Sequence, residues 1–217
     1  MKASIFQNFV QWIEDKSLIV ITKTIQEGKY KEQVEAIRKL IAEGKQEEAD
    51  NLKKRLPAFT PSGTFNNGRK ADLLTKYSSH VILDIDKITE QQILEVLQKV
   101  ALIPHTFAAF ISPSGNGVKI IVAVSSAGEH HKIAFGQVAA YYAAELQITI
   151  DPSGKDVSRL CFMSYDPNCY RNINAVTFQV IIEEEAQQSI TVETPAIAEQ
   201  AQEETNEDWE ASFGKCI

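Results

Sequence analysis

The sequence predicts an α+β fold, in which an antiparallel sheet carries two helices on one face and follows an N-terminal helical region. Residues 80–86 (HVILDID) form an apolar run that ends in two acids. Residues 106–112 and 118–124 are two further apolar runs with β-branched residues, joined by a glycine-rich turn. Helical spacing between and after these runs gives the order strand, helix, strand, strand, helix, strand over residues 80–164.

Residues 1–56 are expected to form the helical region and to pack on the sheet. Apolar positions recur at helical spacing over residues 4–14 and 17–27, and the charged stretch 30–54 carries one apolar stripe. The turn-forming residues of FTPSGTFNNGR then predict a hairpin or an ordered loop before the first strand of the sheet.

The sheet domain is assigned to residues 57–182. Thr89 and Gln92 have the spacing of a capping box, so a helix is expected to begin there and to end before Pro104. Residues 129–147 predict the second helix. The remaining strands are expected at residues 158–164 and 175–182. This order is the split βαβ arrangement of ferredoxin-like and RRM-like domains, with the first strand central, the strand after the second helix beside it, and one sheet face open.

The net charge of −7 is concentrated in a C-terminal tail. Residues 183–217 hold ten Asp or Glu and one Lys, which leaves a balance of about +2 on the rest of the chain. The tail has few apolar residues and no sustained periodicity, so we expect it to be disordered. The near-neutral remainder is compatible with a nucleic-acid partner.

Composition also excludes several classes of protein. No apolar run approaches the roughly 20 residues that a membrane span requires, and the first residues lack a signal-peptide core, so we expect a cytoplasmic protein with no membrane association. The three cysteines have no CxxC spacing, so neither a zinc site nor a disulfide framework is expected.

Asp84 and Asp86 are the first candidate site residues. They lie two apart on a predicted strand, so both side chains are expected on the same face. Two close carboxylates repel each other unless a cation neutralises them, and Mg²⁺ or Mn²⁺ takes oxygen ligands of this kind. The alternative is that both acids only end the strand and solvate its edge.

The turn between the second and third predicted strands is the second candidate. Its sequence, SPSGNGVK, offers hydroxyls, backbone N–H groups and a cation to a phosphate, from residues Ser112, Ser114, Gly115, Gly117 and Lys119. A Ser-Gly-Asn-Gly turn is also a common hairpin turn without any ligand. We expect Lys119 to be an exposed lysine near the turn, whose replacement by alanine would leave the fold intact.

The loop after the second helix adds Asp151 and Arg159. Asp151 would complete a metal site with Asp84 and Asp86, and Arg159 would hold a phosphate oxygen. The alternatives are an Asx turn at Asp151 and an arginine paired with Asp156 or Asp166.

In combination these motifs resemble a known family. Their order is similar to that of the motifs in the archaeo-eukaryotic primase superfamily: VILDID, then ISPSGNGVKIIV, then an aspartate followed by the arginine-bearing SRLCFMS. More closely, the chain resembles the N-terminal domain of bacterial VirE-like (virulence-associated E) proteins. The segments that carry this resemblance are KKRLPAFTPSGTF, then SSHVILDIDKI, and later DPSGKDVSRLCFMSYDP. The resemblance covers roughly residues 1–180.

The resemblance implies an RRM-like catalytic palm. It assigns metal binding to Asp84, Asp86 and Asp151, and the incoming triphosphate to Arg159 and the turn. The implied partners are a single-stranded template, NTPs or dNTPs, and a helicase acting in trans. One position departs from the pattern of that superfamily, because Lys119 stands where it usually has a histidine, and a lysine cannot serve as the same neutral hydrogen-bonding group.

Two functions follow from different classes. The first is a primase- or polymerase-like nucleotidyltransferase with a two-metal mechanism, acting in replication of a bacterial chromosome or mobile element. The second is a catalytically inactive module of the same fold that binds nucleic acid or a replication partner. In both, the expected nucleic-acid-binding residues are Lys53, Lys54, Arg55, Arg69, Lys70 and Lys76.

Overall fold

The computed structural model describes residues 1–182 of the chain. The acidic tail predicted to be disordered, residues 183–217, lies outside the described residues. Within them, the longest and most apolar helices fall short of what crossing a membrane requires.

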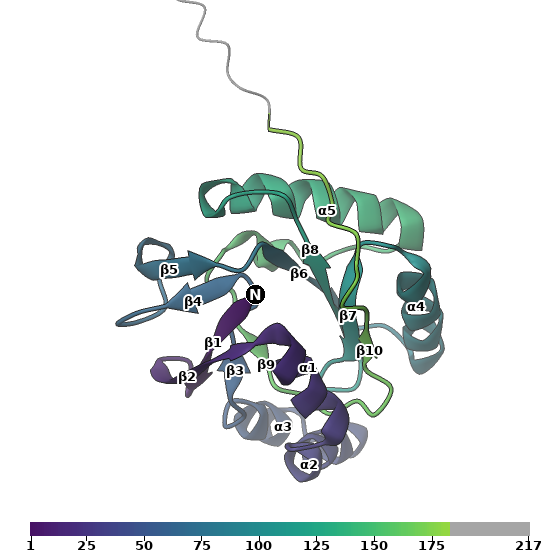
Figure 1. Ribbon diagram of the computed structural model, residues 1–217. Coiled ribbons are helices and arrows are strands. Elements are labelled where there is room, and N and C mark those ends of the chain that lie inside the picture. The colour runs from purple at the N-terminus through teal and green to yellow at the C-terminus, as the bar shows by residue number, and fades with distance from the viewer. Residues whose placement is uncertain (183–217) are drawn as a thin grey trace, which may run out of the picture. The chain divides into compact units, whose positions relative to one another are not determined.

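The N-terminal region begins with a β-hairpin and continues with three helices (Figure 1). The hairpin pairs β1 (Lys2–Gln7) with β2 (Gln11–Ser17), so the helix expected over residues 4–14 is wrong. Four consecutive residues of β1 are buried. A strand buried on both faces lacks the alternation of exposed and buried residues that marks a strand, so periodicity alone cannot distinguish it from a helix. The helices are α1 (Leu18–Glu27), α2 (Lys31–Ala42) and α3 (Gln46–Lys53).

The strands of the chain form two four-stranded antiparallel sheets, the first of which includes the N-terminal hairpin. The first has the order β2-β1-β3-β9, where β3 is Ala58–Phe59 and β9 is Cys161–Phe162. The second has the order β10-β7-β8-β6, with β6 (His80–Asp86), β7 (Thr106–Ile111), β8 (Gly117–Ala123) and β10 (Tyr170–Arg171). A separate small hairpin joins β4 (Gly63–Phe65) to β5 (Leu74–Tyr77). The predicted α+β class with antiparallel pairing is therefore confirmed.

The two helices that cover the second sheet are α4 (Glu90–Leu102) and α5 (His131–Leu146). The predicted capping box begins α4, because the Thr89 side chain accepts from the N–H of Gln92 while the Gln92 side chain accepts from the N–H of Thr89. Alternate residues of β6, Val81, Leu83 and Ile85, point into the core that these helices share with the sheet.

The fourth strand of the expected βαββαβ order lies elsewhere. The segment around Cys161 forms β9, which pairs with β3 in the first sheet instead of lying beside β6. In place of the expected neighbouring strand, the loop after α5 makes one backbone hydrogen bond to β6, in which the N–H of Asp151 donates to the carbonyl of Asp84 (2.9 Å). The strand expected over residues 175–182 is reduced to a single bridge between Phe178 and Val124.

The second face of the β6–β8–β7 sheet is covered, in contrast to the open face expected. Ile82, Phe107 and Ile121 on this face pack in one core with residues of β1, β3 and α1, including Ile5 and Ile21. The N-terminal region therefore lies over the sheet as a second layer (Figure 1). Asp84 and Asp86 share the face of Ile82, where the two layers leave a cavity between them.

Candidate metal and phosphate site

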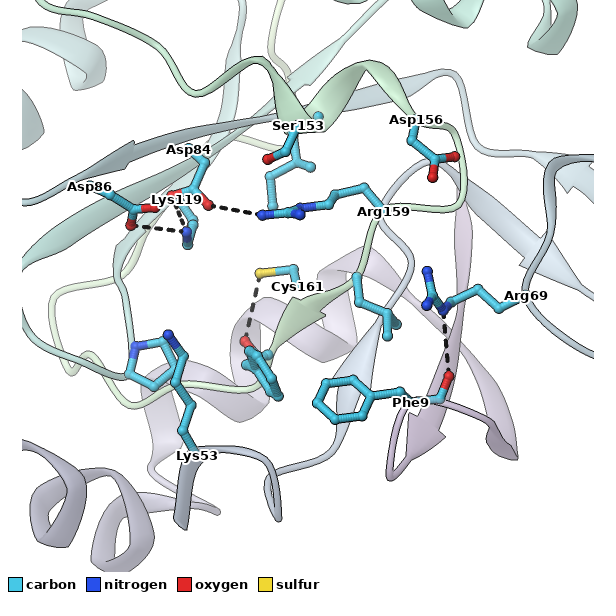
Figure 2. A pocket seen from close by; sticks show the side chains of 15 residues that line it. Phe9, Lys53, Arg69, Asp84, Asp86, Lys119, Ser153, Asp156, Arg159 and Cys161 are labelled. Carbon is cyan, nitrogen blue, oxygen red and sulfur yellow. Dashed lines mark hydrogen bonds and ion pairs between the residues drawn. The ribbon is translucent and has the colours of Figure 1, made fainter. Parts of the chain in front are cut away.

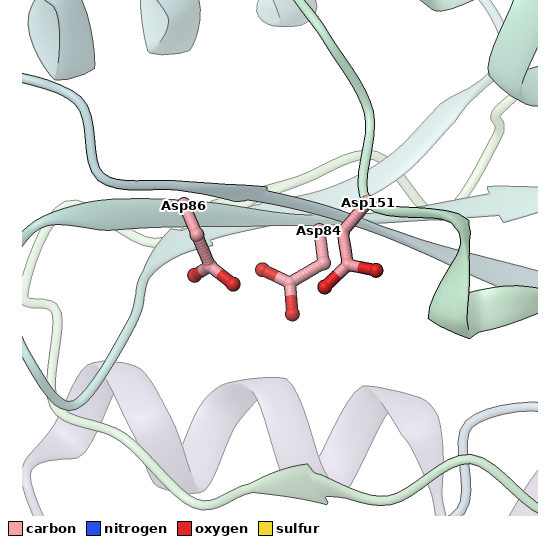
Figure 3. A group of neighbouring side chains, drawn as sticks. All are labelled: Asp84, Asp86 and Asp151. Atoms are coloured by element: carbon pink, nitrogen blue, oxygen red, sulfur yellow. The ribbon is translucent and has the colours of Figure 1, made fainter.

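Three carboxylates converge at the end of β6. Asp84 and Asp86 project from the same strand, and Asp151 comes from a loop about 65 residues later in the sequence. One ligand oxygen from each lies within 4.8 Å of the others. Figure 3 shows the Asp84 carboxylate between those of Asp86 and Asp151, all pointing to the same side of β6. Carboxylate oxygens in this arrangement suit a hard divalent cation such as Mg²⁺ or Mn²⁺.

An Asx turn and a glycine allow the loop that carries Asp151 to lie against β6. Asp151 precedes a short 3₁₀ helix, η3 (Pro152–Lys155), and its carboxylate accepts from the N–H of Ser153 (2.7 Å). This is the Asx turn given above as an alternative, and it coexists with the convergence of the carboxylates. Gly154 allows the close approach, because a Cβ at this position would collide with the carbonyl of Ile82 and the ring of Phe135.

Two basic side chains from different elements reach the same carboxylates. Lys119 on β8 lies opposite Asp84 in the strand register and forms an ion pair with it, and its Nζ lies 3.5 Å from Asp86 Oδ1. Arg159 Nη2 lies 3.7 Å from Asp84 Oδ2. Arg159 therefore turns toward Asp84 and not toward Asp156 or Asp166, the partners considered from the sequence. Lys119 is largely buried in the strand, so the expectation of an exposed lysine is wrong.

Burial and charge set the protonation of these groups. Burial raises the pKa of Asp84, an effect that the charge of Lys119 opposes and that of Asp86 strengthens. Burial alone would lower the pKa of Lys119, but the charges of Asp84 and Asp86 raise it. Partial burial would raise the pKa of Asp151, whereas hydrogen bonds from Ser153 and the charges of Arg159 and Lys119 lower it. Lys119 and Asp151 are therefore both charged at neutral pH.

A cavity of about 340 Å³ begins at this cluster and extends between the two layers (Figure 2). That volume is within the range of small-molecule sites. Its lining combines carboxylates, four basic side chains and aromatic rings. The lining residues include Asp84, Asp86, Lys119, Arg159, Lys53, Arg69, Phe9, Phe162, Ser153, Asp156 and Cys161. Burial raises the pKa of the Cys161 thiol to about 12, so this thiol is neutral and unreactive near neutral pH.

The glycine-rich turn is adjacent to the cavity, which it lines through Pro113. The N–H groups of Ser112 and Gly115 are used inside the turn, donating to Gly117 O (2.8 Å) and Ser112 O (3.0 Å). Ser114 Oγ accepts from Lys53 (3.1 Å). The turn is further held by Arg38, whose Nη2 donates to the carbonyls of Ser112 (3.1 Å) and Tyr165 (2.9 Å). These bonds give the turn a structural role, and its phosphate-binding role stays a prediction.

The six expected nucleic-acid-binding residues are divided between two places. Lys53 and Arg69 line the cavity. The other four are exposed on the surface outside its lining: Lys54, Arg55, Lys70 and Lys76. Arg69 is also a structural residue, because it donates to the carbonyls of Phe9 (3.4 Å) and Ser158 (2.9 Å).

Sequence reasoning missed the aromatic and polar residues at the other end of the cavity. Phe9 lies in a segment expected to be helical, and no turn signal marked it. Asp156 accepts from the N–H and hydroxyl of Ser158 (both 2.9 Å), a local Asx pattern that could have placed it in an ordered loop.

Comparison with known proteins identifies one family. A family model described as BT4734-like, N-terminal domain, matches residues 51–170, more than half of the chain. No curated protein and no solved structure matches the chain. The matched family is different from the archaeo-eukaryotic primase superfamily and from the VirE-like N-terminal domain, so the expected membership in those groups is wrong. The motifs that suggested it, a strand ending in Asp-x-Asp and a glycine-rich turn, are short and occur in unrelated folds.

Proposed function

For a chain that belongs to the BT4734-like, N-terminal domain family, we propose a divalent-metal-dependent nucleotidyltransferase that acts on nucleic acid. The observation that carries the proposal is the convergence of Asp84, Asp86 and Asp151 beside a cavity that also contains Lys53, Lys119, Arg69 and Arg159. Transfer of a nucleotidyl group requires carboxylates that bind cations and, beside them, basic groups that bind phosphates. In this function, β6, β7 and β8 with α4 and α5 would act as an RRM-like palm that lacks its fourth strand.

The proposed reaction joins a 3′-hydroxyl to the α-phosphate of a nucleoside triphosphate. The new bond is between O3′ and the α-phosphorus, the bond to the β-phosphate oxygen breaks, and pyrophosphate leaves with the electron pair. Bound Mg²⁺ or Mn²⁺ would stabilise charge on the attacking and leaving oxygens.

The protein's own groups bind and orient the reactants. Asp84, Asp86 and Asp151 would hold the cations, and Asp151, anionic at neutral pH, would also attract the proton that leaves the hydroxyl. Arg159 and Lys53 would turn toward a triphosphate at little cost. Arg159 gives up only an ion pair of 3.7 Å to Asp84, and Lys53 only a hydrogen bond to the Ser114 hydroxyl. Lys119 would move from the carboxylates toward the phosphates when cations bind.

A second candidate is a non-catalytic module that binds nucleic acid. The observation in its favour is Lys119, whose ammonium group already neutralises Asp84 and lies close to Asp86. If this ion pair persists, the carboxylates have no need of a metal. The module would bind a strand through the exposed residues Lys54, Arg55, Lys70 and Lys76.

Template extension separates the two candidates. The protein is incubated with a single-stranded DNA or RNA template, labelled NTPs or dNTPs, and Mn²⁺, and products are resolved by size. We expect template-dependent products that fall at least about 100-fold in Asp86→Asn and are unchanged in Asp72→Asn, an exposed aspartate outside the cavity. Absence of product from the wild-type chain, with strand binding retained, would favour the binding module.

A further inference from the structure

The cavity has two chemically different ends. Figure 2 shows Asp84, Asp86 and Lys119 on one side, and Phe9 with Arg69 on the other. The first end has charged groups suited to metal and phosphate. At the second end, the half-buried ring of Phe9 lines the cavity next to a guanidinium group. A ligand that spans both ends therefore needs an anionic part and a flat apolar part.

Phe9 holds a backbone conformation that a phenylalanine rarely adopts. Asn8 and Phe9 have φ values of 51° and 67°, and the N–H of Val10 donates to the carbonyl of Gln7 (3.3 Å), which closes the β1–β2 turn. Such turns favour Asn followed by Gly, because both central residues need positive φ. A left-handed conformation is unfavourable for a residue with a Cβ, because the Cβ comes too close to the following carbonyl oxygen. Backbone strain of this kind is concentrated at functional sites.

Two contacts hold the strained residue, and a third holds the arginine that contacts it. The Phe9 ring meets the Phe162 ring edge to face, with centroids 5.5 Å apart and planes at 77°. Arg69 Nε donates to the Phe9 carbonyl (3.4 Å), and Arg69 Nη1 donates to the carbonyl of Ser158 (2.9 Å). The hairpin turn is thereby tied to two loops that border the cavity. The ring is a preorganised surface in the cavity wall.

We propose that Phe9 forms the nucleobase subsite of this cavity, against which the base of a nucleoside triphosphate stacks while its phosphates lie toward Lys119, Arg159 and Lys53. The inference rests on the proposed function and specifies where the base of its substrate binds. Stacking on an aromatic ring accepts every base, since each has a π-face. The subsite would therefore distinguish a nucleotide from inorganic polyphosphate and not one base from another.

The test compares two probes, a nucleoside triphosphate and inorganic tripolyphosphate, each with Mn²⁺, by isothermal titration. The main variant is Phe9→Gly, which removes the ring and places the favoured residue after Asn8, so thermal stability should be retained or raised. We expect its triphosphate affinity to fall about 5- to 150-fold with tripolyphosphate affinity unchanged. Phe9→Tyr should keep most of the nucleotide affinity. Trp12→Ala, which removes an exposed aromatic of the same hairpin outside this cavity, should change neither affinity.

The outcomes separate this inference from the proposed function. Three results would each overturn the subsite. One is equal nucleotide affinity in Phe9→Gly and the wild type, and another is an equal loss of affinity for both probes. The third is a lowered melting temperature with no selective loss of affinity for the nucleotide. If tripolyphosphate and Mn²⁺ bind equally well to the wild type and to Asp84→Asn, the proposed function fails, while a selective loss in Phe9→Gly would still establish the base contact. Binding of neither probe to the wild type would contradict both.

Discussion

Lys119 on β8 lies opposite Asp84 on β6, and its ammonium group pairs with the Asp84 carboxylate at the place where a cation would bind. Both side chains are close to fully buried, with exposed fractions of 13% and 10%. A buried carboxylate needs a positive partner, and either Lys119 or a divalent ion satisfies that need. The structure shows the state that the lysine neutralises, and the proposed function requires a second state in which metal takes over that role.

The first prediction concerns Lys119→Met, which keeps the apolar stem and removes the charge. Asp84 would then keep only the more distant Arg159 guanidinium, 3.7 Å from its Oδ2, so the free energy of unfolding in EDTA should fall by about 1–3 kcal/mol. Mn²⁺ should restore part of the loss by replacing the missing charge. Chemical denaturation with and without Mn²⁺ measures both effects, and the exposed Lys132→Met is the matched control. Unchanged stability in EDTA would mean that the ion pair contributes little.

The second prediction concerns the loop that brings Asp151 to β6. In Gly154→Ala the new methyl group would push η3 away from Ile82 and Phe135, with a loss of roughly 1–3 kcal/mol of stability. The same displacement should weaken Mn²⁺ binding. Gly136→Ala on α5 is the control, because no atom lies within 4 Å of its Cβ position and a helical alanine should stabilise by about 0.5–1 kcal/mol. Full Mn²⁺ affinity in Gly154→Ala would show that the loop position is not required.

The third prediction is a pH dependence of stability that comes from His80. Burial lowers the pKa of His80 from 6.5 to about 4, and its Nδ1 lies 2.8 Å from the carbonyl of Ser78. The unfolded chain takes up the proton first as pH falls, so the stabilisation is complete above the unfolded pKa and is lost between about pH 6.5 and 4. The total loss from this residue is about 3 kcal/mol.

His80→Asn tests this assignment, since the amide can keep a donor near the Ser78 carbonyl without titrating in this range. The difference in unfolding free energy between wild type and variant should shrink as pH falls from 7 toward 4, measured by urea denaturation. A difference that stays constant over this range would exclude His80 as its source. Aspartates and glutamates that titrate in both proteins cancel in the comparison.

Local signals predicted the helices and the hairpin of the second sheet. The capping residues Thr89 and Gln92 define where α4 begins, and the Ser-Gly-Asn-Gly turn joins β7 to β8, because both depend on residues a few positions apart. The hairpin of β1 and β2 was not predictable in this way. Its buried strand has no alternation, and its turn contains Phe9 where a glycine would have given the signal.

Strand pairing explains what else the sequence could not predict. The segment at Cys161 has an apolar pattern that fits either sheet, and its partner β3 lies about 100 residues earlier in the chain. The approach of Asp151 to Asp84 was expected from a strand that would lie beside β6. In the structure it comes instead from one backbone hydrogen bond and from Gly154. The role of Lys119 depended on strand register, which the sequence did not specify.

The metal-dependent function requires Asp84, Asp86 and Asp151 to bind a divalent cation. Titration of the wild-type chain with Mn²⁺, followed by electron paramagnetic resonance, should show at least one bound ion per chain. Asp151→Asn should weaken this binding at least about tenfold without loss of thermal stability, because Asp151 lies at the edge of the site. Asp72→Asn should bind as the wild type does. If the wild type and Asp151→Asn bind Mn²⁺ equally, Asp151 is not a ligand and the three-carboxylate site is contradicted. If neither binds it, the carboxylates are neutralised by the protein's own basic groups and the metal-dependent function is contradicted.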